Sequence, residues 1–388
     1  MLLSISLLLG LGIIGQYVSQ KLKLPALISY LLIGLCVGPF ALNGVAESFL
    51  NVGPDIKEIA LIIILIRAGL SLNIEDLERH GKVAILMCIL PATVEIGATI
   101  ILGHLLLGLT YLEALILGTV IAAVSPAVVV PGMINMMDRG KGTKEGIPQL
   151  ILAGASADDI YVLVLFTVFM GMQGTGDISF VSFLAVPVSI VLGITVGWLL
   201  SKGIGQVIHR TQLKTVSVVV LLLAMSMLLL VVEEHAQGWF SGLIAVIVLA
   251  MGIADYLPDQ YQQYKHQFNQ LWVVAEMFLF MFVGMATNLQ VALSFGWVPI
   301  LFIILTSGFR MLGVYLALQP TQLTSPEKLF TMGAYLPKAT VQAAIGGIPL
   351  AMGMDAGALI LTVAVLEILI TAPIGAVWIA KMQDKLLS

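Results

Sequence analysis

Apolar residues run in long blocks along this chain, and short polar segments separate the blocks. A helix needs about 20 consecutive apolar residues to cross a lipid bilayer, and the blocks have or approach that length. The pattern therefore predicts about 13 membrane-spanning helices. They are expected at residues 3–19, 25–41, 56–72, 83–107, 112–136, 148–172, 178–201, 214–232, 239–255, 268–286, 291–317, 329–351 and 356–380.

The composition supports an all-α polytopic membrane protein. Of the 388 residues, 59% are hydrophobic and only 10% are charged. Soluble domains carry about 25% charged residues, so the chain cannot cover itself with a charged surface. An ordinary cytosolic enzyme, a disordered chain and a nucleic-acid partner are therefore excluded, and membrane lipid is the expected surrounding.

The basic residues predict the orientation of these spans. Loops on one side hold most of the lysines and arginines, whereas loops on the other side hold only Lys57. Cytoplasmic loops carry an excess of positive residues. We therefore expect the N-terminus outside and the C-terminus in the cytoplasm.

A few charged residues fall inside the predicted spans. A charge at the bilayer centre costs about 2.5–3.5 kcal/mol on insertion scales, so such residues face protein or water and are functional candidates. They are Arg67, Glu95, Asp158, Asp159, Arg310, Lys338 and Glu367. Arg67 is close enough to a span end to reach the interface, and Glu367 is expected to hydrogen-bond inside the helix bundle.

Asp158 and Asp159 lie together in the sixth span. Adjacent residues on a helix point about 100° apart, so one carboxylate can face a cavity and the other a neighbouring helix. The small residues 153–157 before them allow another backbone to approach closely. Two partly desolvated carboxylates can exchange protons for a cation. The alternative is a structural pair bonded to amides and cations.

Two spans contain residues that interrupt helices. Pro126 and Pro131 fall within the fifth span, and Pro337 falls within the twelfth beside Lys338. Proline removes a backbone donor and clashes with the preceding turn, although a plain kink is the alternative for the fifth span. The two spans are seven apart and hence opposite in direction. Interrupted helices at matching positions of inverted repeats indicate a transporter's substrate site.

The remaining intramembrane charges suggest counter-charges. Glu95 and Arg310 form the natural buried ion pair, structural or gating in role, with direct ion coordination as the alternative. Arginine stays charged and cannot carry a proton. Lys338 has two open roles: it neutralises an aspartate when no cation is bound, or it compensates the dipole ends at the helix break.

These motifs resemble the sodium/proton antiporters of the cation:proton antiporter superfamily. The similarity rests on VSPAVVVPGM at 124–133, EGIPQLILAGASADDI at 145–160 and YLPKATVQAAIGG at 335–347. It points to the NHA branch, the bacterial relatives of the animal NHA exchangers, and covers essentially the whole chain. The resemblance implies a NhaA/NapA-like fold of inverted repeats with two crossed discontinuous helices, in a bacterial inner membrane.

The resemblance also implies an organisation for residues 1–388 as one transport unit. A dimerisation domain would comprise about 1–55 with 178–255, and an ion-transporting core about 56–172 with 268–388. The protein would be a homodimer whose core moves like an elevator.

The same resemblance suggests roles for single residues. Asp159 is similar to the main ion-binding carboxylate and Asp158 to the second, while Ser125 is a candidate ligand. Glu95 and Arg310 resemble the interhelical ion pair of the NHA branch. Several electrogenic members carry Lys where this chain has Arg310, so the proton-to-sodium ratio stays open unless Lys338 takes that part.

The expected function is therefore secondary transport in pH homeostasis, with Na⁺ or Li⁺ exchanged for H⁺ and no cofactor or enzymatic step. A K⁺/H⁺ antiporter is the main alternative. A sodium-coupled organic-anion symporter would not need adjacent carboxylates, and a channel would conduct far faster. An intramembrane aspartyl protease needs its two aspartates on different helices.

Overall fold

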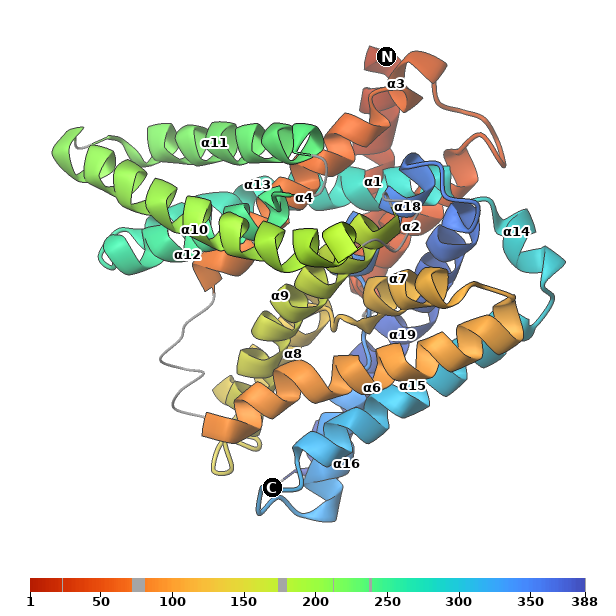
Figure 1. Cartoon of the computed structure of the whole chain (residues 1–388). Coiled ribbons are helices and arrows are strands. Elements are labelled where there is room, and N and C mark those ends of the chain that lie inside the picture. Colours follow the sequence, from red (N-terminus) through yellow and green to blue (C-terminus); the bar gives the residue numbers. More distant parts are fainter. Residues whose placement is uncertain (23, 72–80, 174–179, 212, 237–238, 388) are drawn as a thin grey trace. The chain divides into compact units, whose positions relative to one another are not determined.

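The computed structural model describes residues 1–388 except 23, 72–80, 174–179, 212, 237–238 and 388, and the described part is helical without strands. Figure 1 shows the helices in sequence colours. Their bounds are α1 (Leu2–Leu22), α2 (Ala26–Val37), α3 (Glu47–Leu50), α4 (Gly53–Ser71), α6 (Gly81–Leu107), α7 (Tyr111–Ala122), α8 (Pro126–Asp138), α9 (Ile147–Gln173), α10 (Phe180–Thr211), α11 (Thr215–His235), α12 (Gly242–Tyr256), α13 (Tyr261–Ala286), α14 (Leu289–Ser294), α15 (Val298–Ala317), α16 (Ser325–Ala334), α17 (Thr340–Ile345), α18 (Ile348–Ala351) and α19 (Gly357–Leu386).

Most of the predicted spans coincide with long apolar helices. Within the described ranges, 9 segments are long and apolar enough to cross a membrane, with α7 and α8 counted together. The segments Ala26–Val37, Gly242–Tyr256 and Thr340–Ala351 are apolar but shorter. The end of the predicted third span, residue 72, and the start of the seventh, 178–179, lie outside the described residues. The total of 13 spans stays a prediction.

Contacts group the chain into two compact units. Unit 1 comprises Met1–Lys57, Asn73–Val162 and Met277–Ser388, and unit 2 comprises Glu58–Leu72 and Leu163–Glu276. The helices α4, α9 and α13 each contribute to both units. This grouping reflects packing density within one chain, so the predicted division into dimerisation and transporting domains stays a prediction.

In unit 1, helices α6 and α15 pack against each other at close range. A Cβ atom on Gly313 would lie 2.7 Å from the Cα of Pro91, so only glycine permits this approach. Small residues allow helix backbones to come together in membranes. Glu95 lies one turn after Pro91, and Arg310 lies about one turn before Gly313. The close contact therefore brings the two charged residues to the same level.

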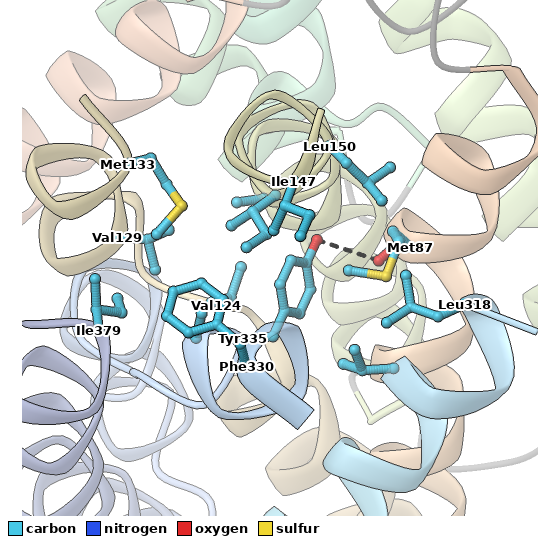
Figure 2. Packing of buried hydrophobic residues seen from close by; sticks show 14 of the residues in the cluster. Met87, Val124, Val129, Met133, Ile147, Leu150, Leu318, Phe330, Tyr335 and Ile379 are labelled. Carbon is cyan, nitrogen blue, oxygen red and sulfur yellow. Dashed lines mark hydrogen bonds between the residues drawn. The ribbon is translucent and has the colours of Figure 1, made fainter. Parts of the chain in front are cut away.

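An apolar cluster fills unit 1 between α6, α8, α9, α15, α16 and α19 (Figure 2). Its fully buried members include Met87, Val129, Ile147 and Phe330. Tyr335 is the polar exception, and its hydroxyl donates a hydrogen bond to the Met87 carbonyl at 3.2 Å, drawn dashed in Figure 2. Buried tyrosines usually find such a partner. The cluster holds α16 and its C-terminal continuation against α6.

Two helix interruptions meet inside unit 1. After α7 the chain is extended at 123–125 before α8 begins, and after α16 it is extended at 336–339 before α17 begins. The Ser125 amide donates to the Pro337 carbonyl at 2.7 Å. The Gln342 side-chain amide donates to the Ala123 carbonyl at 2.7 Å. Backbone groups freed by the breaks are thus satisfied within the protein, as a lipid environment requires.

The prolines act differently at these two breaks. Pro126 starts α8, where its missing N–H costs nothing and its fixed φ favours the first helical turn. Pro337 lies within the second extended stretch. Pro131, expected from the sequence to interrupt the fifth span, lies inside α8, which continues through it. Only one helical hydrogen bond is lost there, and the helix tolerates the loss.

Unit 2 contains a tight pair of helices, α10 and α12. A Cβ atom on Gly197 would lie 2.5 Å from the Ala245 carbonyl oxygen, so this seam also depends on glycine. Arg67 on α4, to which the sequence assigned no role, has partners in the same unit. Its Nε donates to Asn269 at 2.8 Å, and its guanidinium lies 5.0 Å from the Trp272 ring centre.

Candidate functional site

Arg310 is the centre of a fully buried polar cluster in unit 1. Its Nη1 lies 2.9 Å from Glu95 Oε2, and its Nη2 lies 2.8 Å from Asp158 Oδ2. Its Nε donates to the Tyr335 carbonyl at 2.9 Å, and Nη1 also donates to the Ala122 carbonyl. The planar guanidinium can serve several acceptors at fixed angles, which a lysine cannot do. Arg310 therefore joins α6, α7, α9 and the segment after α16.

Lys338 forms an ion pair with the Glu95 carboxylate, which also binds Arg310. Its Nζ is 2.6 Å from Glu95 Oε2 and 2.5 Å from the Ile121 carbonyl oxygen in the last turn of α7. Its backbone amide donates to Thr371 Oγ1 at 3.0 Å. A cation beside the carbonyl end of a helix is favoured by the helix dipole. These contacts place the ammonium at a helix end, and which of its two predicted roles Lys338 takes stays a prediction.

Asp158 is held at the break between α7 and α8. Its Oδ2 accepts hydrogen bonds from Arg310 and from the Val124 amide, the latter at 2.8 Å. The two cations thus lie at the carbonyl end of α7, while this anion lies beside the amide end of α8. Each charge has the sign that the adjacent helix end prefers. Asp158 Oδ1 has no hydrogen-bond partner among the described residues.

Asp159 differs from its neighbour because no ion pair links it to a cation in the described part of the chain. The residue is 5% exposed, and its Oδ1 is buried without a hydrogen-bond partner in the described part of the chain. The charged groups that act on the Asp159 carboxyl are Asp158 and Arg310. An unpartnered buried carboxylate is costly. A bound cation or a proton would remove that cost.

Ser125 is also buried without a side-chain partner. It occupies the position before α8 where a serine usually caps the helix, yet it makes no such hydrogen bond. Its backbone is fixed by the Pro337 carbonyl, and its neighbour Val124 binds Asp158. The Ser125 hydroxyl oxygen is therefore free to act as a ligand, and the residue adjoins Val124, whose amide binds Asp158.

The donor set at this site consists of carboxylate and hydroxyl oxygens. Hard cations prefer carboxylate, carbonyl and water ligands. Across the described ranges, no group of three or more His, Cys, Asp or Glu side chains could hold a metal ion.

Two polar residues of the cluster were not singled out in the sequence. Gln342 accepts from the Ala339 amide at 2.8 Å through Oε1 and donates to the first break through Nε2. The Arg310 guanidinium lies over the Tyr335 ring, 5.3 Å from the ring centre. The available signal was their position, since both flank Pro337 and Lys338 in an apolar span. Spacing alone does not show which polar residue bridges two breaks.

Glu367 on α19 is the remaining buried acid. It is 0% exposed, and neither of its carboxylate oxygens has a hydrogen-bond partner among the residues described. The hydrogen bonding within the bundle that the sequence suggested is therefore not seen.

Comparison with known proteins gives consistent matches over nearly the whole chain. A family model described as "Sodium/hydrogen exchanger, transmembrane" matches residues 4–383. The human sodium/hydrogen exchanger 9B2 is 31% identical over 408 residues, covering 100% of this chain and 75% of that protein. The human sodium/hydrogen exchanger 9B1 is 29% identical over 399 residues, covering 97% and 76%.

A solved structure has the same fold. The sodium proton antiporter MjNhaP1 from Methanocaldococcus jannaschii superposes with a TM-score of 0.83, covering 99% of each chain at 22% identity. At this identity the similarity concerns the fold alone.

Proposed function

This chain belongs to the transmembrane sodium/hydrogen exchanger family, and from that premise we propose that it exchanges Na⁺ or Li⁺ for H⁺ at the Asp158–Asp159 pair. Members of the family are transporters and not enzymes, which removes the intramembrane protease alternative. We assign the chain to the NHA branch, with 13 spans and a NhaA/NapA-like pair of crossed broken helices.

The observation that carries this proposal is the unequal partnering of the two aspartates. Asp158 is bound through one oxygen by Arg310 and Val124, so its position is fixed. Asp158 Oδ1, Asp159 Oδ1 and Ser125 Oγ are buried acceptors without partners in the described chain. We assign Asp159 as the main ligand, with Asp158 and Ser125 as its helpers. The Glu95, Arg310 and Lys338 side chains balance charge and hold the breaks together.

Exchange follows from competition at Asp159. Bound Na⁺ displaces the proton from the carboxylate, and a rise in proton concentration displaces Na⁺. With either ligand the side chain is neutralised, whereas the empty carboxylate keeps a charge that is costly to carry through an apolar barrier. A core that crosses only when loaded exchanges one ion for the other. We propose that it crosses by an elevator motion against a dimerisation domain within a homodimer.

Transport in proteoliposomes tests this proposal. When Na⁺ or Li⁺ is added outside, its entry should be balanced by proton exit and alkalinise the lumen, and Asp159→Asn should abolish this response. The exposed variant Asp259→Asn serves as the matched control. Proton movement with K⁺ and not with Na⁺ would instead identify a K⁺/H⁺ antiporter. Normal exchange by Asp159→Asn would disprove the site.

We also propose a bacterial inner membrane as the location, with the N-terminus outside. The bias of basic residues to one side supports this orientation. A reporter that fluoresces only in the cytoplasm should be bright when fused to the C-terminus. A dark fusion with normal transport would reverse the orientation.

A further inference from the structure

Glu367 is a buried acid to which the proposed exchange mechanism assigns no role. It lies on α19, a helix that packs against α7, α8, α16 and α17 in unit 1. It is 0% exposed, and both carboxylate oxygens are buried without a hydrogen-bond partner among the residues described. A charged carboxylate that is shut off from the solvent surface, with no donor and no direct ion pair among the described residues, is costly.

The surroundings of Glu367 connect it to the polar cluster without neutralising it. One turn further along α19, the Thr371 hydroxyl donates to the Glu367 carbonyl at 2.8 Å and accepts from the Lys338 amide. The charged groups that act on the Glu367 carboxyl are Lys338, Glu95 on α6 and Arg310 on α15. The charged residues of the neighbouring helices α8 and α16, which are Asp138, Glu327 and Lys328, are not among the groups that act on this carboxyl. Lys338 itself is already committed to Glu95 at 2.6 Å.

The buried acids of the cluster outnumber its buried cations, and Glu367 is the acid without a matching cation. The cations Arg310 and Lys338 are matched by Glu95 and Asp158, and the three ion pairs among these four side chains are at most 2.9 Å long. Asp159 is neutralised by the transported cation or proton. No counter-charge among the described residues is left for Glu367, and an uncompensated charge at this depth is disfavoured.

We propose that Glu367 is a second proton-binding site of this protein. It keeps its proton both when Na⁺ is bound and when H⁺ is bound at Asp159, so its proton is resident and is not exchanged. When alkaline solution removes this proton, the cluster gains a negative charge that no cation balances, and transport stops. The link to transport rests on the proposed function, whereas the protonation of Glu367 does not.

Infrared spectroscopy reads this proton directly in the purified full-length protein. A protonated carboxylic acid has a carbonyl stretch that an ionised carboxylate lacks. We expect this band at neutral pH with and without Na⁺, its loss in Glu367→Gln, and its displacement in Glu367→Asp, which also identifies the band if Glu367→Gln does not fold. Glu47→Gln, at an exposed position, should leave the band unchanged. A band that is absent, or unaffected by both Glu367 variants, overturns the proposal.

Transport supplies the second measurement. Glu367→Gln resembles the protonated acid, so it should exchange at the wild-type rate near neutral pH. Above the pH at which Glu367 ionises, the wild-type rate should fall about tenfold per pH unit, and Glu367→Gln should escape this fall. A folded Glu367→Gln that cannot exchange at neutral pH would show that the ionised form is needed. Because the infrared band does not depend on transport, failure of the wild type to exchange would count against the proposed function only.

Discussion

The buried polar cluster has two sides that differ in how their charges are partnered. On one side, Glu95, Arg310 and Lys338 form short ion pairs and also bind backbone carbonyls at the end of α7. On the other side, Asp159 and Ser125 keep oxygens that no described residue satisfies. Glu95 Oε1 also has no partner among the described residues, so the two sides differ in ion pairing and not in complete hydrogen bonding. Short buried ion pairs hold one arrangement, whereas a buried carboxylate without such a pair needs a ligand.

The paired side should be the more sensitive to loss of a single partner. Glu95→Gln removes the carboxylate that balances both Arg310 and Lys338, so two buried cations lose compensation. Breaking a buried ion pair costs about 3–5 kcal/mol, and we expect a large fall in the melting temperature in detergent. Glu47→Gln is the surface control. A melting temperature equal to that of the wild type would show that the paired side does not hold the fold.

The unpaired side should respond in the opposite direction. Asp159→Asn removes a buried charge that no side chain compensates, while its amide keeps the shape. We expect the free energy of unfolding to rise by about 1–3 kcal/mol, because folding no longer has to desolvate a carboxylate that has no partner. The gain should be seen without Na⁺ at alkaline pH, where the wild-type carboxylate has lost its proton, and it should shrink as Na⁺ stabilises the wild type. A destabilised Asp159→Asn would place this carboxylate among the structural groups.

Ser125→Ala should have a smaller effect on the same side. The hydroxyl makes no hydrogen bond in the described structure, so its loss leaves no donor unsatisfied. Loss of one neutral oxygen ligand should weaken apparent Na⁺ affinity by about tenfold, or 1.4 kcal/mol, without lowering the melting temperature. Sodium titration of exchange at fixed pH measures this. An unchanged affinity would remove Ser125 from the ligand set.

The smallest effect is expected outside the cluster. Arg139 on the C-terminal side of α8 pairs with Asp384 on α19 at 2.9 Å, but the two side chains are 45% and 50% exposed. Exposed pairs contribute about 0–1 kcal/mol because water and salt screen them. Arg139→Ala should therefore change stability little and exchange not at all. A loss comparable with that of Glu95→Gln would mean that burial does not control the value of these pairs.

Much of this cluster could be predicted from the sequence because lipid makes intramembrane charges rare. The sequence predicted the pairing of Glu95 with Arg310, because a buried arginine is always charged and requires an anion beside it. The structure brings the two side chains together. The break before Pro126 followed from proline chemistry. The total of 13 spans stays a prediction, since α2, α12 and the Thr340–Ala351 segment are shorter than a full span.

Other features could not be predicted from residue spacing. The sequence shows that Lys338 is buried, but only the fold shows that it lies on Glu95 and the end of α7. Pro131 was expected to interrupt a helix, yet α8 absorbs it. For Glu367 the sequence suggested a hydrogen-bonded acid, and the absence of described partners depends on side chains from several distant segments. Such contacts arise from three-dimensional packing and leave no periodic signal in one sequence.

Proton release on sodium binding tests the central claim, which is that Na⁺ and H⁺ compete for Asp159. Sodium chloride is added to purified protein in weakly buffered detergent solution at a pH where the site is protonated, and a pH indicator records the protons released, with choline chloride as the blank. The competition predicts saturable proton release by the wild type and by Asp259→Asn, and none by Asp159→Asn. Equal release by wild type and Asp159→Asn, or none by the wild type across the pH range, would contradict it.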